Sequence, residues 1–368
     1  MEDCLFLLIR LGLLTEQPSR DTLNKLESLS DKEWRKLCEL SERQGVSAIA
    51  VDGLNKLFEK CGQQKLGTNM SPAEWQLFLL EWMGSMLVLE QSNKNQFEVM
   101  DRLSKKWTEA GCRVMVMKGQ ANAVLYPRPE HRSTGDIDCY LFENYAKGNE
   151  IARDNGASVD ESWYKHSVIS YRDETFENHQ YFVHTRDGKG GKLLEKELED
   201  ALKVDSSKFV PLSEYVVCPP VQWTAMFLTY HACAHFISEG LSLKQLLDWA
   251  MFLNKHQNDV DWPRFYEFCG RHHLSRFADV ATAIAKEHIG IEITNGEIKC
   301  ESPYTEKVLQ SALYDDDYVF GSGKGNWYNR LHLVRNLWTY RWKYRDIYQM
   351  SPLRQLWYYA TGFIFKTE

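Results

Sequence analysis

The stretch Asp136-Ile-Asp-Cys-Tyr-Leu141 constrains this chain more than any other, because its polar and apolar residues alternate with a period of two. Its Ile, Cys, Tyr and Leu content favours a half-buried strand over a helix. On a strand, Asp136, Asp138 and Tyr140 share one face, and we expect the intervening apolar side chains to turn into the core. Neighbouring carboxylates repel each other unless they share a cation. The pattern therefore predicts a strand that offers paired acidic ligands.

Hard oxygen ligands at this spacing suit Mg²⁺, which binds one or two carboxylates together with waters and the phosphate oxygens of a substrate. The chemistry of such a site is phosphoryl or nucleotidyl transfer. Taken alone, Asp-x-Asp at the start of a strand is also a common turn or cap feature. The preceding sequence favours the metal site, because Arg113-Val-Met-Val-Met117 is typical of a strand and leads into the turn Lys118-Gly119.

The order of strand, glycine turn, short connection and Asp-x-Asp strand resembles the nucleotidyltransferase superfamily of the polymerase-β type. The resemblance is more specific to an uncharacterised bacterial nucleotidyltransferase family, related to nucleotidyltransferase toxins, with a Lys-Gly turn, a Tyr-Pro segment and an Arg before Asp-Ile-Asp. Here these pieces are Lys118-Gly119, Leu125-Tyr126-Pro127, and Arg132 followed by Asp136-Ile137-Asp138. One difference is Gln120, which stands where the superfamily usually has a second Gly or a Ser.

The resemblance implies a site for two Mg²⁺ ions, held by Asp136, Asp138 and a third carboxylate on a neighbouring strand. We expect the third carboxylate to be Glu177, because the family has a Glu two residues before a His, here Glu177-Asn178-His179. Its role is to accept the proton of the attacking hydroxyl or to hold the second metal. The alternatives are Asp160, Asp173 and Glu174.

The expected nucleotide-binding residues surround the glycine turn. The resemblance implies that the backbone at Lys118, Gly119 and Gln120 approaches the triphosphate. Lys118 and Arg132 are candidate phosphate binders, the Lys as a point charge and the Arg as a bidentate fork. Further along, Lys244 and Asp248 lie one helical turn apart, so a salt bridge between them is the simplest interpretation. The resemblance to the toxins implies instead that both face the nucleotide.

Other motifs admit two interpretations each. For Lys165-His166, surface charge is favoured over contact with the triphosphate. His231-Ala-Cys-Ala-His235 has the spacing of half a zinc site but lacks the Glu of a metalloprotease, which favours histidines that are buried or face the cleft. Gly321-Ser-Gly-Lys-Gly325 lacks the spacing of a Walker loop. Residues 324–345, basic and aromatic, are typical of a solvated helix face, with peripheral contact to RNA or an anionic membrane surface as the alternative.

The composition is that of a soluble globular protein, with 43% hydrophobic and 26% charged residues. No apolar run approaches the roughly 18 residues of a transmembrane segment. The acidic N-terminus lacks the basic region of a signal peptide, and we interpret residues 1–10 as an amphipathic helix. The nine cysteines are scattered, so neither a disulfide framework nor a zinc ribbon is indicated, and a cytoplasmic location is expected. The net charge of −7 argues against non-specific binding to nucleic acid.

Helical patterns precede and follow the predicted strands. Ser30 and Ser71 each begin a capping box, and the helix after Ser71 is predicted to run past Gln96 towards Trp107. Gly111 is predicted to end that helix.

Downstream, residues 166–172 and 175–183 predict a β-hairpin, and 185–191 predict a mobile, lid-like loop. Pro219-Pro220 opens a long apolar helix that ends before Gly240. We predict an α+β fold with a small mixed β-sheet. The predicted regions are an N-terminal helical region (1–110), a nucleotidyltransferase αβ core (111–204) and a C-terminal helical domain (205–368).

These features predict a Mg²⁺-dependent nucleotidyltransferase that binds an NTP such as ATP, transfers NMP to an acceptor hydroxyl and releases pyrophosphate. Two alternatives stay open. One is a catalytically inactive nucleotide- or RNA-binding module of the same fold, and the other is a toxin-like enzyme that nucleotidylates tRNA or protein. The sequence does not fix the NTP, the acceptor (a small molecule, tRNA or protein) or the oligomeric state.

Overall fold

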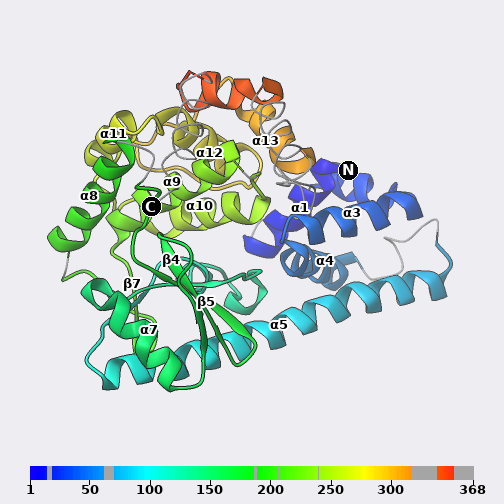
Figure 1. Ribbon diagram of the computed structural model, residues 1–368. Helices are drawn as coiled ribbons and strands as arrows, with labels where there is room; N and C mark the ends of the chain where they lie inside the picture. Colours follow the sequence, from blue (N-terminus) through cyan, green and yellow to red (C-terminus); the bar gives the residue numbers. More distant parts are fainter. Residues whose placement is uncertain are drawn as a thin grey trace.

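The structure, a computed structural model, describes residues 1–14, 19–61, 70–185, 189–205, 207–238, 240–315 and 338–351. One β-sheet lies between two sets of helices (Figure 1). The long helix α5 (Pro72–Glu109) and α7 (Tyr145–Asp154) lie on one side of it, and the C-terminal helices lie on the other. This arrangement confirms the predicted α+β class.

The sheet contains seven strands in the order β3-β4-β5-β2-β1-β7-β6. The pairs β2–β5 and β1–β7 are parallel, and the other neighbours are antiparallel, so the sheet is mixed as predicted. The strands are β1 (Val114–Val116), β2 (Ile137–Tyr140), β3 (Ser158–Asp160), β4 (His166–Tyr171), β5 (Glu174–His179), β6 (Val210–Pro211) and β7 (Val216–Cys218).

The helices fall into three groups along the chain. The N-terminal helices are α1 (Glu2–Leu13), α2 (Arg20–Glu27), α3 (Asp31–Arg43) and α4 (Ser47–Cys61). Short helical turns between the strands are α6 (Gln120–Ala123), η2 (Pro129–His131) and η3 (Phe142–Asn144). The later helices are α8 (Lys189–Val204), α9 (Val221–Ser238), α10 (Leu243–His256), α11 (Trp262–Arg271), α12 (Ser275–Glu287), α13 (Thr305–Tyr314) and the π-helical turn η4 (Lys343–Ile347).

Local sequence signals set the ends of several elements. The Ser71 amide donates to Glu74 Oε2 at 2.9 Å, and the Glu74 amide donates to Ser71 Oγ at 3.3 Å, which confirms the predicted capping box of α5. Gly111, with φ of +81°, follows the end of that helix. The β4–β5 hairpin turns at Arg172 and Asp173, both with positive φ as two-residue hairpin turns require.

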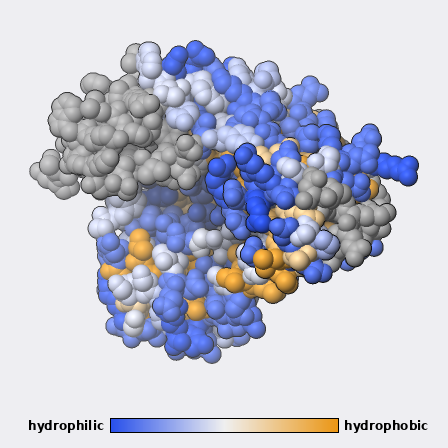
Figure 2. All heavy atoms as spheres, turned by 90° about the vertical axis from the view of Figure 1, so that its right-hand side faces the viewer, coloured by the Kyte–Doolittle hydropathy of each residue, from blue (hydrophilic) through white to orange (hydrophobic). Residues whose placement is uncertain are grey.

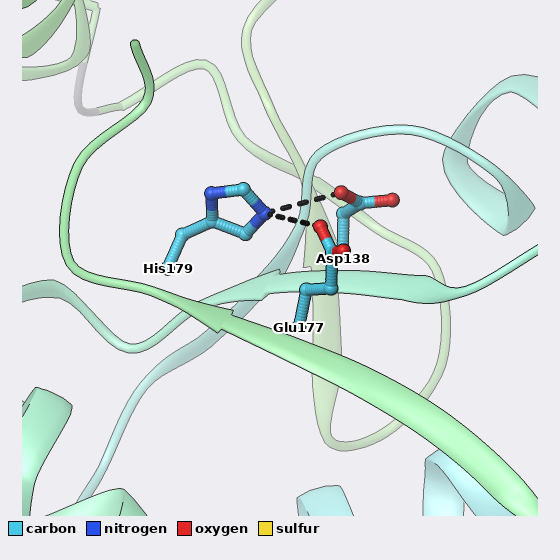
Figure 3. A group of neighbouring side chains, drawn as sticks. All are labelled: Asp138, Glu177 and His179. Carbon is cyan, nitrogen blue, oxygen red and sulfur yellow. Dashed lines mark hydrogen bonds and ion pairs between the residues drawn. The ribbon is translucent and has the colours of Figure 1, made fainter. Parts of the chain in front are cut away.

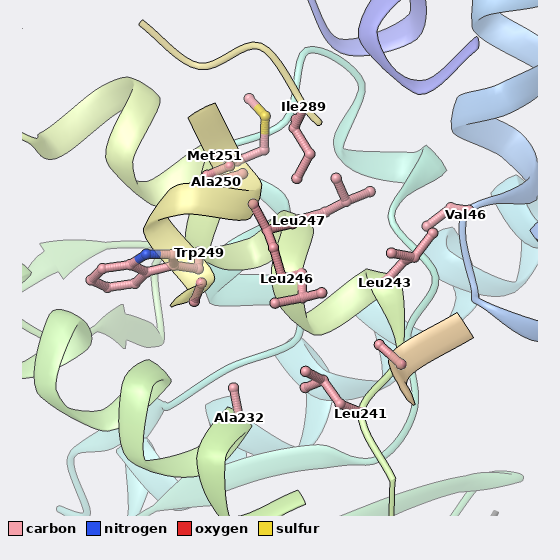
Figure 4. Close-up of a cluster of buried hydrophobic side chains, with 14 of the residues drawn as sticks. Val46, Ala232, Leu241, Leu243, Leu246, Leu247, Trp249, Ala250, Met251 and Ile289 are labelled. Atoms are coloured by element: carbon pink, nitrogen blue, oxygen red, sulfur yellow. The ribbon is translucent and has the colours of Figure 1, made fainter. Parts of the chain in front are cut away.

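Two hydrophobic clusters hold the fold together. Ile137 and Cys139 of β2 belong to a cluster with Leu103 and Trp107 of α5, which confirms the predicted core face of the acidic strand. The other cluster includes residues of α1, of α4 and of the C-terminal helices. Figure 4 shows its part around α10. The Leu243 amide at the start of α10 donates to Gln44 Oε1 at 2.8 Å, so polar contacts also join the N-terminal and C-terminal helices.

Two local predictions were wrong. Helix α1 exists, but every residue from Cys4 to Ile9 is buried, because the helix lies inside the larger cluster instead of exposing a polar face. Lys189, Gly190 and Gly191 form the first turn of α8 and are therefore no part of a loop. The residues that follow bury a stripe at helical spacing, which extends the helix to this point; its members are Leu194, Leu198 and Leu202. Residues 186–188 lie outside the described residues.

Candidate active site

The Lys118-Gly119 turn lies beside the Asp-x-Asp strand. The Met117 amide donates to the Asp138 carbonyl oxygen at 2.9 Å, which continues the pairing of β1 with β2. Gly119 has φ of +68°, a left-handed conformation that glycine adopts readily. A Cβ atom at this position would lie 3.9 Å from the Asp136 carbonyl oxygen. The glycine turn therefore passes next to the start of the acidic strand.

Asp138, Glu177 and His179 converge on one face of the sheet (Figure 3). In the parallel pair β2–β5, Asp138 lies opposite Glu177, and His179 follows two residues later on the same face. The His179 Nε2 atom lies 3.1 Å from Asp138 Oδ1 and 3.3 Å from Glu177 Oε2. One ligand atom from each side chain lies within 4.8 Å of the others. This cluster has the geometry to hold a metal ion.

Burial and charge act in opposite directions on this cluster. Asp138 is only 2% exposed, and although burial raises the pKa of a carboxyl, the Lys118 ammonium and His179 hold the pKa of Asp138 well below its usual range. The Lys118 Nζ atom lies 3.0 Å from Asp138 Oδ2. Burial lowers the pKa of His179, but its hydrogen bonds with Asp138 and Glu177 raise it overall. Asp138 is therefore ionised and available as a ligand.

Asp136, the other predicted metal ligand, stands at the exposed edge of the site. It precedes β2, and its carboxylate is outside the group of ligand atoms formed by Asp138, Glu177 and His179. Burial raises the pKa of Asp136, and the charges of Glu177 and Asp138 raise it further. The side chain is thus within electrostatic reach of the cluster, and its role as a ligand stays a prediction.

The alternatives to Glu177 lie elsewhere. Glu174 Oε2 accepts a hydrogen bond from Gln96 of α5 at 3.0 Å. Asp173 is exposed at the hairpin turn, and Asp160 Oδ1 caps the exposed Ser162 amide at 2.8 Å. Glu177 is the candidate that the fold places beside Asp138.

Three lysines lie near the predicted acidic ligands. Lys118 and Lys165 are near Asp138 and Glu177, and Lys244 is near Asp136. Lys118 pairs with Asp138, whereas Lys165 and Lys244 have no carboxylate within salt-bridge distance among the described residues. Burial lowers the pKa of Lys165 despite the nearby charges of Asp138 and Glu177. Its side chain is half-buried, and contact with a triphosphate stays a prediction. Burial and the charge of Arg132 lower the pKa of Lys244. Desolvated ammonium groups without partners suit a polyphosphate.

Arg132 and Asp248 form a buried pair with each other. Arg132 Nε donates to Asp248 Oδ1 at 2.7 Å, and Arg132 Nη2 donates to Asp248 Oδ2 at 2.6 Å. Asp248 also accepts from Asn122 Nδ2 at 3.0 Å and from the Tyr126 hydroxyl at 2.8 Å. The Lys244–Asp248 salt bridge is therefore not formed, because Arg132 occupies both oxygens of Asp248. This network fastens α10 to the segment between β1 and β2.

Gln120 and Gln96 join the glycine turn to the long helix α5. The buried Gln120 side chain donates its amide to Gln96 Oε1, and Gln96 Nε2 donates to the Gly135 carbonyl oxygen at 2.8 Å. Asn93, one turn earlier, donates to the Arg132 carbonyl oxygen at 3.0 Å. These contacts fix the backbone just before Asp136. The Gln120 side chain is hydrogen-bonded to Gln96. Its contact with a phosphate stays a prediction.

His231 and His235 on α9 lie beside each other, with their Nε2 atoms 3.2 Å apart. Burial lowers the pKa of His231, and the charges of Lys118 and His235 lower it further. The nearby Lys118 charge indicates that His231 faces the site, in agreement with the favoured interpretation. Among the residues that the structure describes, neither histidine joins a group of three metal-ligand side chains.

Figure 2 shows a recess in the surface, and the coloured atoms around it are mainly hydrophilic. Gly321–Gly325 and residues 324–337 of the basic aromatic stretch lie outside the described residues. In the remainder of that stretch, Tyr344 is buried and its hydroxyl donates to the Ile237 carbonyl oxygen at 2.7 Å, while Trp338 is exposed.

In the part of the chain that the structure describes, no helix has the length and apolar character to cross a bilayer.

The fold and the site define an α+β protein whose mixed sheet carries an acidic and histidine cluster beside a glycine turn and three lysines. A family model described as "Uncharacterised nucleotidyltransferase" matches residues 30–290, which is well over half of the chain. The chain therefore belongs to this nucleotidyltransferase family, as the resemblance predicted. No curated protein and no solved structure matches it.

Proposed function

We propose that this protein is a Mg²⁺-dependent nucleotidyltransferase, which transfers NMP from an NTP such as ATP to an acceptor hydroxyl and releases pyrophosphate. The observation that carries the proposal is the meeting of Asp136, Asp138 and Glu177 with three lysines, two of which lack a carboxylate partner among the described residues. A metal-bound triphosphate needs both kinds of group, because its metal requires anionic oxygens and its phosphates require cations.

The acidic residues fit the metal. Asp136, Asp138 and Glu177 supply hard oxygen ligands on or beside neighbouring strands, and Asp138 is held in its charged form. When bound, Mg²⁺ supplies neutralisation of the charge that develops on the phosphate oxygens. The family membership supports this assignment.

The lysines and Glu177 have separate roles in the proposed reaction. Lys118, Lys165 and Lys244 bind the phosphates of the NTP and hold the α-phosphorus in line with the acceptor. The acceptor oxygen forms a bond to the α-phosphorus as the bond from that phosphorus to the pyrophosphate oxygen breaks. The hydroxyl proton passes to the Glu177 carboxylate, and pyrophosphate leaves with the electron pair of the broken bond.

Thermal-shift titration tests the binding step. With Mg²⁺ and each NTP in turn, we expect one nucleotide to raise the melting temperature in a saturable manner, since a ligand of the native state stabilises it by mass action. Asp138→Asn and Glu177→Gln should abolish the shift. Asp173→Asn, at the exposed hairpin turn, is the matched control and should retain it. A lack of response to every nucleotide would contradict the proposal.

The acceptor is identified by incubating the protein with labelled NTPs and cell extract. For the transfer step, we expect Asp138→Asn to lower label incorporation at least about a hundredfold, which is about 2.7 kcal/mol in the activation barrier. Label in small molecules, tRNA or protein distinguishes the acceptor classes, and label in tRNA or protein selects the toxin-like alternative. Nucleotide binding without any pyrophosphate release would select the inactive binding module.

A further inference from the structure

The donor set of the cluster includes a nitrogen atom. Asp138 and Glu177 offer carboxylate oxygens, and the third ligand atom is the imidazole Nε2 of His179. Figure 3 shows this nitrogen directed between the two carboxylates. The ring is 2% exposed, and its centre lies 5.0 Å from that of the His166 ring, so burial and packing restrict its orientation.

The other ring nitrogen of His179 defines the tautomer. Nδ1 lies 3.1 Å from the Tyr181 carbonyl oxygen, and a carbonyl oxygen accepts hydrogen bonds but donates none. Nδ1 therefore carries a hydrogen. Nε2 faces the two carboxylates and donates to them in this structure, and a metal ion that displaces its proton would bind Nε2. Histidines that bind metals are commonly oriented in this way, with the remote N–H donated to a carbonyl or carboxylate.

Metal ions differ in how they use such a set. Mg²⁺ prefers oxygen ligands and keeps several waters, whereas divalent transition metals accept imidazole nitrogen together with carboxylates. A position enclosed by Asp138, Glu177 and His179 thus differs from an all-oxygen position between Asp136 and Asp138.

We propose that the position enclosed by Asp138, Glu177 and His179 binds a divalent transition-metal ion in preference to Mg²⁺, with His179 Nε2 as a direct ligand and with Mn²⁺ as the paramagnetic probe of this class. The inference has two parts. The assignment of this ion as the second of two catalytic metals rests on the proposed function. The existence of the metal-binding site rests on the three side chains alone.

The test uses the full-length protein after removal of metals with a chelator. Mn²⁺ and Mg²⁺ are titrated separately and in competition by calorimetry, and the Mn²⁺-loaded protein is examined by pulsed electron paramagnetic resonance. We expect Mn²⁺ to bind at least about tenfold more tightly than Mg²⁺. The resonance spectrum should show coupling between the Mn²⁺ electron spin and an imidazole nitrogen.

His179→Asn is the informative variant. The Asn amide retains a donor for the Tyr181 carbonyl but has no equivalent of Nε2. We expect the nitrogen coupling to disappear and the preference for Mn²⁺ over Mg²⁺ to fall at least about tenfold. The matched control is His272→Asn, because His272 is also buried, with Nε2 3.2 Å from the Glu197 carboxylate, outside the cluster. This control should retain both properties.

The metal titrations and the resonance spectrum of the wild-type protein test the inference even if His179→Asn fails to fold. Equal affinities for the two ions, Mn²⁺ without nitrogen coupling, or coupling that survives in a folded His179→Asn would each overturn the inference. Nitrogen-coupled Mn²⁺ in a protein that binds no nucleotide would support this inference and refute the proposed function. Nucleotide transfer by a protein with no preference for Mn²⁺ would support the proposed function and refute this inference.

Discussion

Asp138 shows at the scale of one residue how the site keeps a buried charge. A carboxylate so deeply buried stays ionised only if charged and hydrogen-bonded partners compensate for the loss of water. Lys118 contacts one of its oxygens, and His179 contacts the other. The strand pattern predicts where Asp138 points, but these two partners depend on the turn before β2 and on β5. The charge of the predicted ligand is thus decided by its neighbours.

Lys165 is the residue whose substitution best separates function from stability. Its ammonium has lost water without gaining a carboxylate partner among the described residues. We predict that Lys165→Met weakens binding of the Mg²⁺–NTP complex at least about tenfold, since a charge-assisted hydrogen bond contributes about 1.5–3 kcal/mol. The melting temperature without ligand should stay equal or rise, because the variant removes a desolvated charge. Calorimetry and thermal unfolding provide the two readouts.

The control for Lys165 is Lys208→Met. Lys208 is largely exposed and pairs with Asp205, which is outside the acidic cluster, at 2.9 Å. Nucleotide affinity should therefore be unchanged in this variant. If Lys165→Met retained wild-type affinity, Lys165 would have no role in phosphate binding.

At the scale of elements, α1 and α4 cross at a pair of glycines. A Cβ atom at Gly53 of α4 would collide with the Leu8 carbonyl group of α1, and one at Gly12 of α1 would collide with the Ile49 carbonyl group of α4. The glycines therefore permit the two helix backbones to approach each other closely. The consequence is a tightly packed helix pair at the start of the chain.

Because of this crossing, we expect alanine substitutions at two helical glycines to change the stability of the protein in opposite directions. Gly53→Ala should destabilise the protein by about 1–3 kcal/mol, because overpacking at α1 outweighs the gain in helix propensity. Gly84→Ala in α5 should stabilise it by about 1 kcal/mol, since a Cβ atom there meets nothing within 4 Å. Urea unfolding of both variants beside the wild type measures the difference. Equal effects of the two substitutions would contradict the close approach of α1 and α4 at Gly53.

At the scale of the whole molecule, buried polar networks join parts that are distant in sequence. Arg132 and Asp248 join the segment before β2 to α10. His131 lies between Asp52 of α4 and Glu90 of α5, with 2.6 Å from its Nδ1 to Asp52 Oδ2 and 2.6 Å from its Nε2 to Glu90 Oε1. His131 and Arg132 are adjacent in sequence. The segment that leads into the acidic strand is therefore bound to α4 and α5 through His131 and to α10 through Arg132.

The His131 network predicts a pH dependence of stability. Burial lowers the pKa of His131, but the hydrogen bonds with Asp52 and Glu90 raise it overall above its usual value of about 6.5. A histidine whose pKa is raised by folding stabilises the native state fully below its unfolded pKa, and this contribution disappears as the pH rises through the folded pKa. We therefore expect wild-type stability to fall, relative to His131→Gln, as the pH rises above about 6.5.

Urea unfolding of both proteins at intervals from about pH 6 to about pH 9, a range that spans the ordinary histidine pKa, provides the measurement. His256→Gln is the control, because His256 at the end of α10 also pairs with a carboxylate, that of Asp259, but in an exposed position. A stability difference between wild type and His131→Gln that did not change with pH would contradict the prediction.

The three regions expected from the sequence, 1–110, 111–204 and 205–368, stay a prediction. Their boundaries follow changes in sequence pattern, whereas the larger hydrophobic cluster includes residues from both the first and the last region. Strand β7 also pairs with β1, although it lies beyond residue 204. We propose that these regions describe the order of patterns along the chain, while the N-terminal and C-terminal helices fold around one shared core.

The sequence by itself determined the features that depend on neighbouring residues. Alternation predicts the face of Asp138 and the core face of Ile137, capping residues predict the start of α5, and the Lys118-Gly119 turn predicts the bend beside the acidic strand. Each of these depends on backbone geometry over a few residues, which local sequence specifies.

Only the tertiary structure decided which distant groups meet. It paired Arg132 with Asp248, placed Lys165 in a desolvated position facing the acids, and added the nitrogen of His179 to the ligand set. The physical reason is that charge and burial depend on what packs against a side chain. For these residues the neighbours come from other strands and from helices more than a hundred residues away.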